Sequence, residues 1–534
     1  MKVFNDNKLT SALKEYDLTD SITPCPVTFS EEFDVKMEKL IRKKQRSYNI
    51  RVHFQHIASA FLLITLLGAL FYILFQQHNT NNELTSLTNT THVTTPPQLT
   101  KRGNIYDRNG VLLVSSRLSD DGNYYIREDH TEYASHLLGY DGVVLVFDEF
   151  LRGADINGEQ ASGQHVYLTI DLELQKVAEN ALREQIERVN LERDEADVIP
   201  GGAVVVTNVN TGEILAAASY PTYELNRFSQ GTYSPGGAFK MVTTLAGFRN
   251  IIPRATRSLV IDDTGIFNKY EDVGMVYHCW FYNTHGLGHR ELNIVQALEC
   301  SCDFFFIQLT DSMMRNDQKH GARMLADAAK EFGLGIATGL EIPESEGHLP
   351  LPEAREARSG YKGWYIADTL LAGIGHGENR YTPVQLANYA ATIANGGTLY
   401  SLSLLHNVKS SDYSKEVIAF KPNVRGVIEE TDIIDIIQEG MLAVSRGKPG
   451  TARLVFGDYP INVASKTGTI QVDGNPYNSF NSYNDGAIID GVFVAYAPAE
   501  KPEIAISVVL EKGGSGSAVI EISRIIFDHF FGLE

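Results

Sequence analysis

Between Ile57 and Phe75 the chain has no charged residue, and this run reads IASAFLLITLLGALFYILF. A helix needs roughly 20 apolar residues to cross a bilayer. A buried core helix is the alternative interpretation, but the length of the run and its lack of charge favour a membrane span. The sequence therefore predicts one transmembrane helix over 57–75, which divides the chain into two unequal parts.

Basic residues gather on only one side of this run. They lie between residues 36 and 51, whereas the first Lys or Arg after the run is Lys101. Under the positive-inside rule, the flank that is rich in Lys and Arg stays in the cytoplasm. We therefore expect a single-pass membrane protein with residues 1–50 as a cytoplasmic tail and everything after Phe75 outside.

Composition limits the partners of this chain. Its 534 residues carry 46 Lys and Arg against 66 Asp and Glu, and the formal net charge of −20 argues against a nucleic acid. Hydrophobic residues make up 43%, which is enough for a large core, and the length indicates more than one domain. Residues 76–100 are rich in Asn and Thr and contain a Pro-Pro pair, so we interpret them as a flexible linker.

From Lys101 onward the pattern is typical of β-structure. Residues 102–114 predict a strand, an Asn-Gly turn and a second strand. A further strand at 166–170 leads into a helix, for which Asp171 is the expected N-cap. One face of that helix is apolar, with residues at helical spacing: Leu174, Val177, Ala178, Ala181, Leu182 and Ile186. We expect a small β-rich domain over 101–197.

The remainder of the chain, 198–534, arranges strands and helices in blocks. Two apolar runs around Asn210-Thr-Gly212 predict a hairpin. Two more strands are expected at 491–498 and 504–510, followed by a C-terminal helix. Helices are expected between these strands in three segments: 233–247, 292–309 and 368–395. Strands, then a helical block, then strands predict a mixed α/β fold with an antiparallel sheet.

Three short motifs in this part carry functional groups. The first, YSPGGAFK, ends at Lys240, and its Pro-Gly turn is expected to open a helix with the lysine one turn inside. The second, SCD, starts at Ser301, and the third, KTGT, starts at Lys466. Each motif is a weak signal alone, because chance matches to four letters are common in a chain of this length.

Further motifs occur in a fixed order along the chain. They are RGNIYDRNGVLLV from Arg102, SHLLG from Ser135, EFLRG from Glu149, VYLTIDLELQKVAE from Val166, GIGHG from Gly373 and YTPVQL from Tyr381. Together with the three motifs above, this ordered set resembles the class B penicillin-binding proteins. The resemblance covers residues 101–534.

The resemblance implies a fold and a setting. It implies an α/β protein whose penicillin-binding/serine β-lactamase-like transpeptidase domain, 198–534, stands on a small β-rich pedestal, 101–197, behind one N-terminal transmembrane helix. It implies a bacterial cell membrane, and peptidoglycan stem peptide or a β-lactam as ligand. A SEDS-family glycosyltransferase or another wall-synthesis protein is the implied partner. No cofactor and no nucleic acid are expected.

The resemblance also assigns roles in acyl transfer. In this family the nucleophilic serine stands three residues before the lysine of the first motif, and here that position is Gly237. Residues three apart lie on one face of a helix, within reach of each other. Lys240 is then the implied base and Ser301 the implied proton relay. Asp303 is implied to contact the substrate amide.

The third motif is implied to bind the substrate. Lys466 and Thr467 would hold its carboxylate, and Gly468 would let its backbone approach the strand. The N–H groups of Thr469 and of residue 237 would stabilise the oxyanion.

Two positions depart from the family pattern. Gly237 offers an N–H group but no hydroxyl. Asp303 stands where the family usually has Asn, and an ionised Asp only accepts hydrogen bonds. Its charge is also expected to hold Lys240 in the protonated form, in which the lysine cannot act as a base.

Cysteine and histidine residues are the remaining chemical groups of interest. The four cysteines have irregular spacings that do not make a disulfide framework: Cys25, Cys279, Cys300 and Cys302. The last two flank Ser301 on the expected helix, where they would face different ways, so we interpret them as buried apolar side chains. A zinc site is a weaker hypothesis for four residues around Trp280: His278, Cys279, His285 and His289. We predict no metal.

Three functional hypotheses follow. The first is a catalytically silent class B penicillin-binding protein of peptidoglycan synthesis, which binds partners or stem peptide. The second is an active peptidoglycan D,D-transpeptidase with an acyl-serine mechanism, of which this sequence is a serine-to-glycine variant. The third is a β-lactam-sensing receptor, which is least favoured because such receptors depend on acylation.

Overall fold

The computed structural model describes residues 101–533, apart from gaps at 123, 140–141, 153–154, 157–158, 161, 195–197, 223–224, 252–256, 316, 473–487 and 514–516. The predicted tail (1–50), transmembrane helix (57–75) and linker (76–100) lie outside the described residues. Within the described part, no helix has both the length and the apolar character that crossing a membrane requires. The described residues all belong to one structural unit, Pro96–Glu534.

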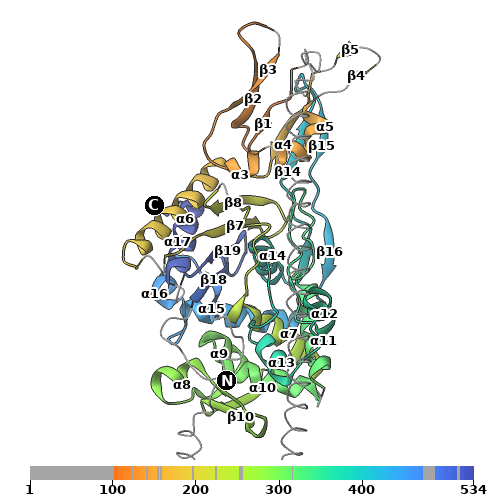
Figure 1. Ribbon diagram of the computed structural model, residues 1–534. Helices are drawn as coiled ribbons and strands as arrows, with labels where there is room; N and C mark the ends of the chain where they lie inside the picture. Colours follow the sequence, from red (N-terminus) through yellow and green to blue (C-terminus); the bar gives the residue numbers. More distant parts are fainter. Residues whose placement is uncertain are drawn as a thin grey trace, which may run out of the picture. The chain divides into compact units, whose positions relative to one another are not determined.

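A five-stranded sheet with the order β17-β18-β19-β7-β8 lies at the centre of this unit (Figure 1). All neighbouring strands are antiparallel, as predicted: β7 (Gly202–Asn208), β8 (Ile214–Tyr220), β17 (Ala464–Val472), β18 (Ile488–Ala497) and β19 (Ile504–Leu510). β7 and β8 form the predicted hairpin, and Gly212 takes a φ of +80° at its turn. β19 is buried along its whole length and apolar except for Ser507, because both faces of the sheet are covered.

Helices cover the two faces of the central sheet. α6 (Leu172–Asn190) and α17 (Ser517–Phe531) lie together over one face, and α14 (Pro383–Ala394) lies over the other (Figure 1). Alternate residues of β7 divide between the two cores. Val204 and Val206 pack beneath α6 and α17, whereas Ala203 and Val205 belong to the core that contains Val384 of α14.

A helical block packs beside the sheet around a further apolar core. Its helices are η2 (Gly236–Phe239), α7 (Lys240–Asn250), α9 (Ile294–Glu299), α10 (Asp303–Met314), α11 (Gln318–Glu331), α13 (Ile366–Ala372) and α15 (Thr431–Arg446). In α7 every residue from Lys240 to Phe248 is buried. The first functional motif is therefore enclosed by the block and does not lie on an exposed helix.

Two of the predicted helices are interrupted. The segment 292–309 is not one helix, because α9 ends before Ser301 and α10 begins after it, and Ser301 has a left-handed φ of +53°. Cys302 caps α10 with its side chain, which starts the new helix. The segment 368–395 is likewise divided between α13 and α14 by a turn in which Gly375 has a φ of +81°.

A six-stranded sheet, in the order β15-β14-β6-β1-β2-β3, forms the second β-layer. Its strands are β1 (Ile105–Tyr106), β2 (Leu112–Leu118), β3 (Tyr125–Asp129), β6 (His165–Leu168), β14 (Leu405–Lys409) and β15 (Glu416–Ala419). β14 and β15 come from a distant part of the chain, so this sheet is not made by 101–197 alone. α3 (Ser135–Leu138), α4 (Val143–Val146) and α5 (Asp148–Leu151) contribute to its core. Asp171 caps α6, as predicted.

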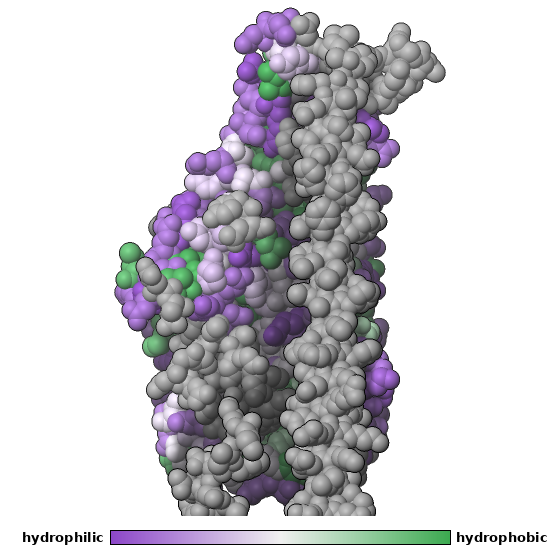
Figure 2. All heavy atoms as spheres, in the orientation of Figure 1, coloured by the Kyte–Doolittle hydropathy of each residue, from purple (hydrophilic) through white to green (hydrophobic). Residues whose placement is uncertain are grey.

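Smaller elements complete the described part. They are β4 (Asp155–Ile156), β5 (Glu159–Gln160), β9 (Val260–Asp263), β10 (Ile266–Tyr270), η3 (Glu271–Val273), β11 (Met275–His278), α8 (Trp280–His285), β12 (Arg290–Asn293), α12 (Pro352–Ser359), β13 (Thr398–Tyr400), β16 (Val424–Val427) and α16 (Arg453–Phe456). The segment from β9 to β12, here called the β9–β12 lobe, packs against α10 (Figure 1). The described surface visible in Figure 2 is largely hydrophilic.

Candidate functional site

The first motif folds into a turn that is held at both ends. Tyr233 exchanges two backbone hydrogen bonds with Tyr381, each with an N–O distance of 2.8 Å. After one turn of 3₁₀ helix, Lys240 begins α7. The neighbouring hydroxyl, that of Ser234, is buried and donates to the Gly375 carbonyl at 2.7 Å, so it takes part in holding the turn.

Lys240 lies at the centre of a polar cluster that the second motif completes. Its Nζ donates to the carbonyl oxygen of Ser301 at 2.7 Å, to Ser301 Oγ at 3.0 Å and to Asp303 Oδ1 at 2.6 Å. Burial alone would raise the pKa of the Asp303 carboxyl, but the charge of Lys240 outweighs burial and holds that pKa below its usual value. Lys240 and Asp303 therefore form an ion pair beneath Ser301.

Lys466 approaches the same serine from the central sheet. It lies on β17, is fully buried, and its Nζ is 2.8 Å from Ser301 Oγ and 3.1 Å from the Thr467 carbonyl oxygen. Burial first, and then the charge of Lys240, lower the pKa of Lys466 well below its ordinary value. Ser301 Oγ thus bridges two lysines, and of these Lys466 is the one whose surroundings favour the neutral amine.

Gly237 faces this bridge. A β-carbon at residue 237 would lie 3.1 Å from Ser301 Oγ, 3.3 Å from Lys466 Nζ and 2.8 Å from the Thr467 carbonyl oxygen. Any side chain here would therefore point into the space between the serine and β17. The structure brings together the four residues predicted for the chemistry: Gly237, Lys240, Ser301 and Asp303. Residue 237, which has no hydroxyl, faces Ser301 Oγ and Lys466 Nζ.

The third motif lies on β17, which is an edge strand of the central sheet. Thr467 Oγ1 is 2.8 Å from Thr451 Oγ1, which orients the Thr467 hydroxyl. A β-carbon at Gly468 would lie 2.1 Å from the Pro235 carbonyl oxygen, so this glycine permits the close approach of the first motif to β17. Thr469 follows in the strand, opposite Gly491.

This arrangement can hold an anion and move a proton, but it offers no hydroxyl at residue 237. An edge strand can pair with an extended peptide through its backbone groups. Lys466 is buried and could attract an anionic ligand only in its protonated form, whereas Thr467 retains 9% of its exposure and can reach a ligand directly. The site therefore has the character of a peptide-carboxylate site.

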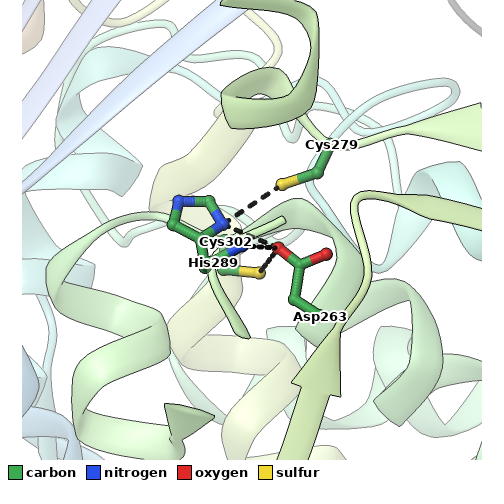
Figure 3. Close-up of side chains that lie close together, drawn as sticks. All are labelled: Asp263, Cys279, His289 and Cys302. Carbon is green, nitrogen blue, oxygen red and sulfur yellow. Dashed lines mark hydrogen bonds and ion pairs between the residues drawn. The ribbon is translucent and has the colours of Figure 1, made fainter. Parts of the chain in front are cut away.

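A second cluster of reactive side chains lies where the β9–β12 lobe meets the start of α10 (Figure 3). It consists of Asp263 at the end of β9, Cys279 before α8, His289 before β12 and Cys302 at the start of α10. One potential ligand atom from each lies within 4.8 Å of all the others. His289 Nδ1 is 2.7 Å from Asp263 Oδ2 and 3.6 Å from Cys279 Sγ, and Cys302 Sγ is 3.3 Å from Asp263 Oδ2.

The pKa values of this donor cluster are shifted in different directions, and burial raises that of the Cys302 thiol well above its ordinary value. Burial opposes the charge on Cys279, but hydrogen bonds with Cys302 and His289 outweigh it and lower the pKa of the Cys279 thiol to about 6. Burial likewise opposes the charge on His289, but Asp263 and Cys279 raise the pKa of the imidazole to about 11. Two sulfurs, one nitrogen and one carboxylate oxygen within this distance match the donor types and number of a four-coordinate zinc site.

A family model described as the penicillin-binding protein transpeptidase domain matches residues 202–530. The chain belongs to the penicillin-binding protein transpeptidase family. Among curated relatives, peptidoglycan D,D-transpeptidase MrdA of Escherichia coli (strain K12) is 27% identical over 470 residues, which are 77% of this chain and 67% of that protein. With the ordered motifs described above, these matches identify a class B penicillin-binding protein.

Solved structures agree with this assignment of the fold. PBP2 of Pseudomonas aeruginosa, in complex with WCK 5153, superposes with a TM-score of 0.65 at 25% identity and covers 82% of this penicillin-binding protein and 96% of that chain. PBP2 of Helicobacter pylori, in a complex with MreC, superposes with a TM-score of 0.64 at 19% identity and covers 81% of this chain and 98% of that chain. The expectation of a mixed α/β penicillin-binding transpeptidase fold is confirmed.

Sequence reasoning about this penicillin-binding protein missed half of the donor cluster. It considered Cys279 and His289 as zinc ligands, but it paired them with His278 and His285, which lie outside the cluster. His285 instead stacks on Phe281, with ring centroids 4.1 Å apart. Cys302 was interpreted as an apolar side chain because a continuous helix was expected there. Asp263 stands in a strand with no motif around it, so the sequence contained no signal for it.

Proposed function

We propose that this class B penicillin-binding protein acts in peptidoglycan synthesis by binding, and that it forms no acyl-enzyme. The observation that carries the proposal is the position of Gly237, which faces Ser301 Oγ and Lys466 Nζ. A hydroxyl at this point would stand next to groups that can take its proton. Glycine supplies none, and Ser234, the nearby alternative, is engaged with Gly375.

The ligand that fits the remaining groups is a peptide with a terminal carboxylate. β17 offers an edge for backbone pairing, Thr467 offers a hydroxyl held by Thr451, and Lys466 lies directly behind it. An arriving carboxylate favours the protonated form of Lys466, which the empty site disfavours. Stem peptide ending in D-alanine, or an intact β-lactam, is then bound without a covalent bond.

Covalent labelling tests the absence of an acyl-enzyme. The purified full-length chain is incubated with a fluorescent penicillin, denatured and run on a gel, and no label is expected even at long times. The matched positive control is Gly237→Ser, which restores the hydroxyl. A non-hydrolysable peptide ending in D-alanyl-D-alanine, followed by calorimetry, reports the non-covalent binding. Label on the unaltered chain would overturn the proposal, and peptide mapping would then locate the nucleophile.

The first alternative is an active D,D-transpeptidase of which this chain is a serine-to-glycine variant. The name of the Escherichia coli relative, peptidoglycan D,D-transpeptidase, favours this alternative. It requires that Gly237→Ser alone acylates at the rate of an ordinary family member. A β-lactam-sensing receptor is a further alternative, and it would require covalent labelling of the unaltered chain.

We also propose a single-pass protein of the bacterial cell membrane that works beside other wall-synthesis proteins. The apolar run 57–75 with basic residues on one side supports the anchor and its orientation. The solved complex of Helicobacter pylori PBP2 with MreC, and a neighbour described as part of a peptidoglycan synthase complex, support a role within an assembly. A SEDS-family glycosyltransferase is the partner to test by co-purification, with and without exchange of 57–75.

The donor cluster is proposed to hold a structural zinc ion. Asp263, Cys279, His289 and Cys302 would supply four ligands, which leaves no open position for a catalytic water. When bound, the ion would join β9, α8 and α10, which already contact one another through the hydrogen bonds from Trp280 to Ser301 and from Cys302 to Asp263. Its proposed role is to fix the start of α10, where Ser301 and Asp303 lie.

A further inference from the structure

Two thiols from different parts of the chain meet in the donor cluster. Cys279 lies before α8 and Cys302 at the start of α10, and their sulfurs lie within 4.8 Å of each other (Figure 3). Both residues are fully buried, so neither is open to general thiol chemistry on the surface. Cys300 is a third buried thiol nearby, but its sulfur is not among the clustered ligand atoms.

Cys302 connects this cluster to the candidate active site. Its sulfur accepts the N–H of Phe305 at 3.3 Å and so caps α10, and its backbone lies between Ser301 and Asp303. A change in the bonding of this sulfur must therefore alter the first turn of α10. That turn carries the carboxylate that pairs with Lys240 at 2.6 Å.

Cys279 directly precedes a short helix. α8 has only six residues, and Asn283 to Leu287, at and just after its end, are exposed, with Leu287 at 67%. Trp280, at the start of α8, donates from Nε1 to the Ser301 carbonyl oxygen at 3.2 Å, so this helix is also held against the start of α10.

We propose that Cys279 and Cys302 form a redox pair, in which a bound metal ion and a disulfide are alternative states of the same site. In the reduced state both thiolates contribute to the metal ligand set. Oxidation by hydrogen peroxide converts them into a Cys279–Cys302 disulfide, and the metal ion is released because two of its four ligands are lost.

The chemistry balances in two steps. One thiolate sulfur attacks an oxygen of hydrogen peroxide, so a sulfur–oxygen bond forms, the oxygen–oxygen bond breaks and hydroxide leaves. The second sulfur then attacks the sulfenic sulfur, so the sulfur–sulfur bond forms and the oxygen departs as water after it has taken a proton. Two thiols are oxidised, and one peroxide is reduced to two waters. The pairing rests on the position of the sulfurs and does not depend on the proposed lack of acylation.

The test compares metal-free and zinc-loaded full-length chain exposed to hydrogen peroxide. Free thiols are then alkylated, and the chain is digested without reduction for mass spectrometry. The expected product in the metal-free sample is one cross-linked peptide pair containing Cys279 and Cys302, with loss of both thiols. The zinc-loaded sample is expected to react several-fold more slowly and to release zinc in step with the disulfide, as measured with a chromogenic chelator.

Cys300→Ser is the matched control, because it removes the neighbouring buried thiol and should leave the cross-link and the zinc release unchanged. Cys279→Ser should abolish both. If that variant does not fold, the peptide map of the unaltered chain still decides the question. A cross-link that contains Cys300 or Cys25 would overturn the proposal, as would full alkylation of Cys279 and Cys302 after oxidation of the metal-free chain.

Discussion

A comparison of Gly237→Ala with Gly237→Ser separates the steric effect of a side chain at residue 237 from the chemical effect of a hydroxyl. The β-carbon that both variants add would lie 2.8 Å from the Thr467 carbonyl oxygen, and this oxygen belongs to the backbone of β17 and cannot rotate away. Overpacking of this kind costs about 1–3 kcal/mol. The backbone of Gly237 is not left-handed. A side chain there therefore also stabilises the folded state by about 0.4–1 kcal/mol, because it lowers the conformational entropy of the unfolded chain.

We therefore expect Gly237→Ala to lower the free energy of unfolding by about 1–2 kcal/mol. The measurement is calorimetric unfolding of the full-length chain, and the expected change is a fall of a few degrees in Tm. Gly426→Ala is the matched control, because a β-carbon there meets nothing within 4 Å. Equal Tm values for Gly237→Ala and this control would refute the claim that Ser301 and β17 crowd residue 237.

Gly237→Ser adds the hydroxyl and is expected to label with a fluorescent penicillin, whereas Gly237→Ala is not. The rate should remain low, because Lys240 Nζ is engaged in the ion pair with Asp303 and is not free to serve as the base, and a positioned base is worth about 10²–10⁴-fold. Adding Asp303→Asn should raise the rate, and the two changes should be non-additive because they act on one proton transfer. A fast single variant would show that Asp303 does no harm. A folded Gly237→Ser protein that never labels would refute the assignment of this position.

Two further outcomes can be measured on the unaltered chain. Affinity for a peptide ending in D-alanyl-D-alanine should fall as the pH rises above the depressed pKa of Lys466, because the bound anion raises that pKa and binding takes up a proton. The fall in affinity is at most tenfold per pH unit. A flat pH profile in calorimetric titrations would contradict this expectation. Removal of zinc by a chelator should lower the Tm, by an amount equivalent to about 2.7 kcal/mol if zinc had been present at 100 times its Kd. His289→Ala should lose this response to the chelator, whereas His285→Ala, outside the donor cluster, should keep it.

The periodic parts of the chain could be predicted from the sequence because their pattern and their burial agree. The β7–β8 hairpin follows from two apolar runs around Gly212, and α6 follows from its cap, Asp171, and its apolar face. The three motifs were correctly expected to come together, because the resemblance supplied their order. Local signals and the ordered motifs were sufficient for these features.

The break around Ser301 could not be predicted, because the local pattern opposes it. From Leu292 to Leu309 the apolar residues continue at helical spacing, yet the chain turns left-handed at Ser301. The contacts that support this turn are tertiary: Trp280 Nε1 donates to the Ser301 carbonyl oxygen at 3.2 Å, and Lys240 Nζ donates to the same oxygen at 2.7 Å. The strands β14 and β15, which join the sheet of the predicted pedestal from a distant segment, were missed for the same kind of reason.

Stability gives a reason for a site that lacks a nucleophile to retain its lysines. A buried lysine needs a partner of opposite charge, and that partner in turn needs the lysine. The side chain of Lys240 is 2% exposed and that of Asp303 16%, so removing either one leaves a largely buried charge, at a cost of about 3–5 kcal/mol. Lys240→Met and Asp303→Asn should therefore each destabilise the chain strongly, while the double variant should recover a coupling energy of about 1–3 kcal/mol in urea unfolding. The exposed pair Lys176 and Glu173 is the control, and its cycle should give less than about 1 kcal/mol. Coupling at Lys240–Asp303 no larger than at this control pair would mean that the ion pair is not what keeps the site assembled.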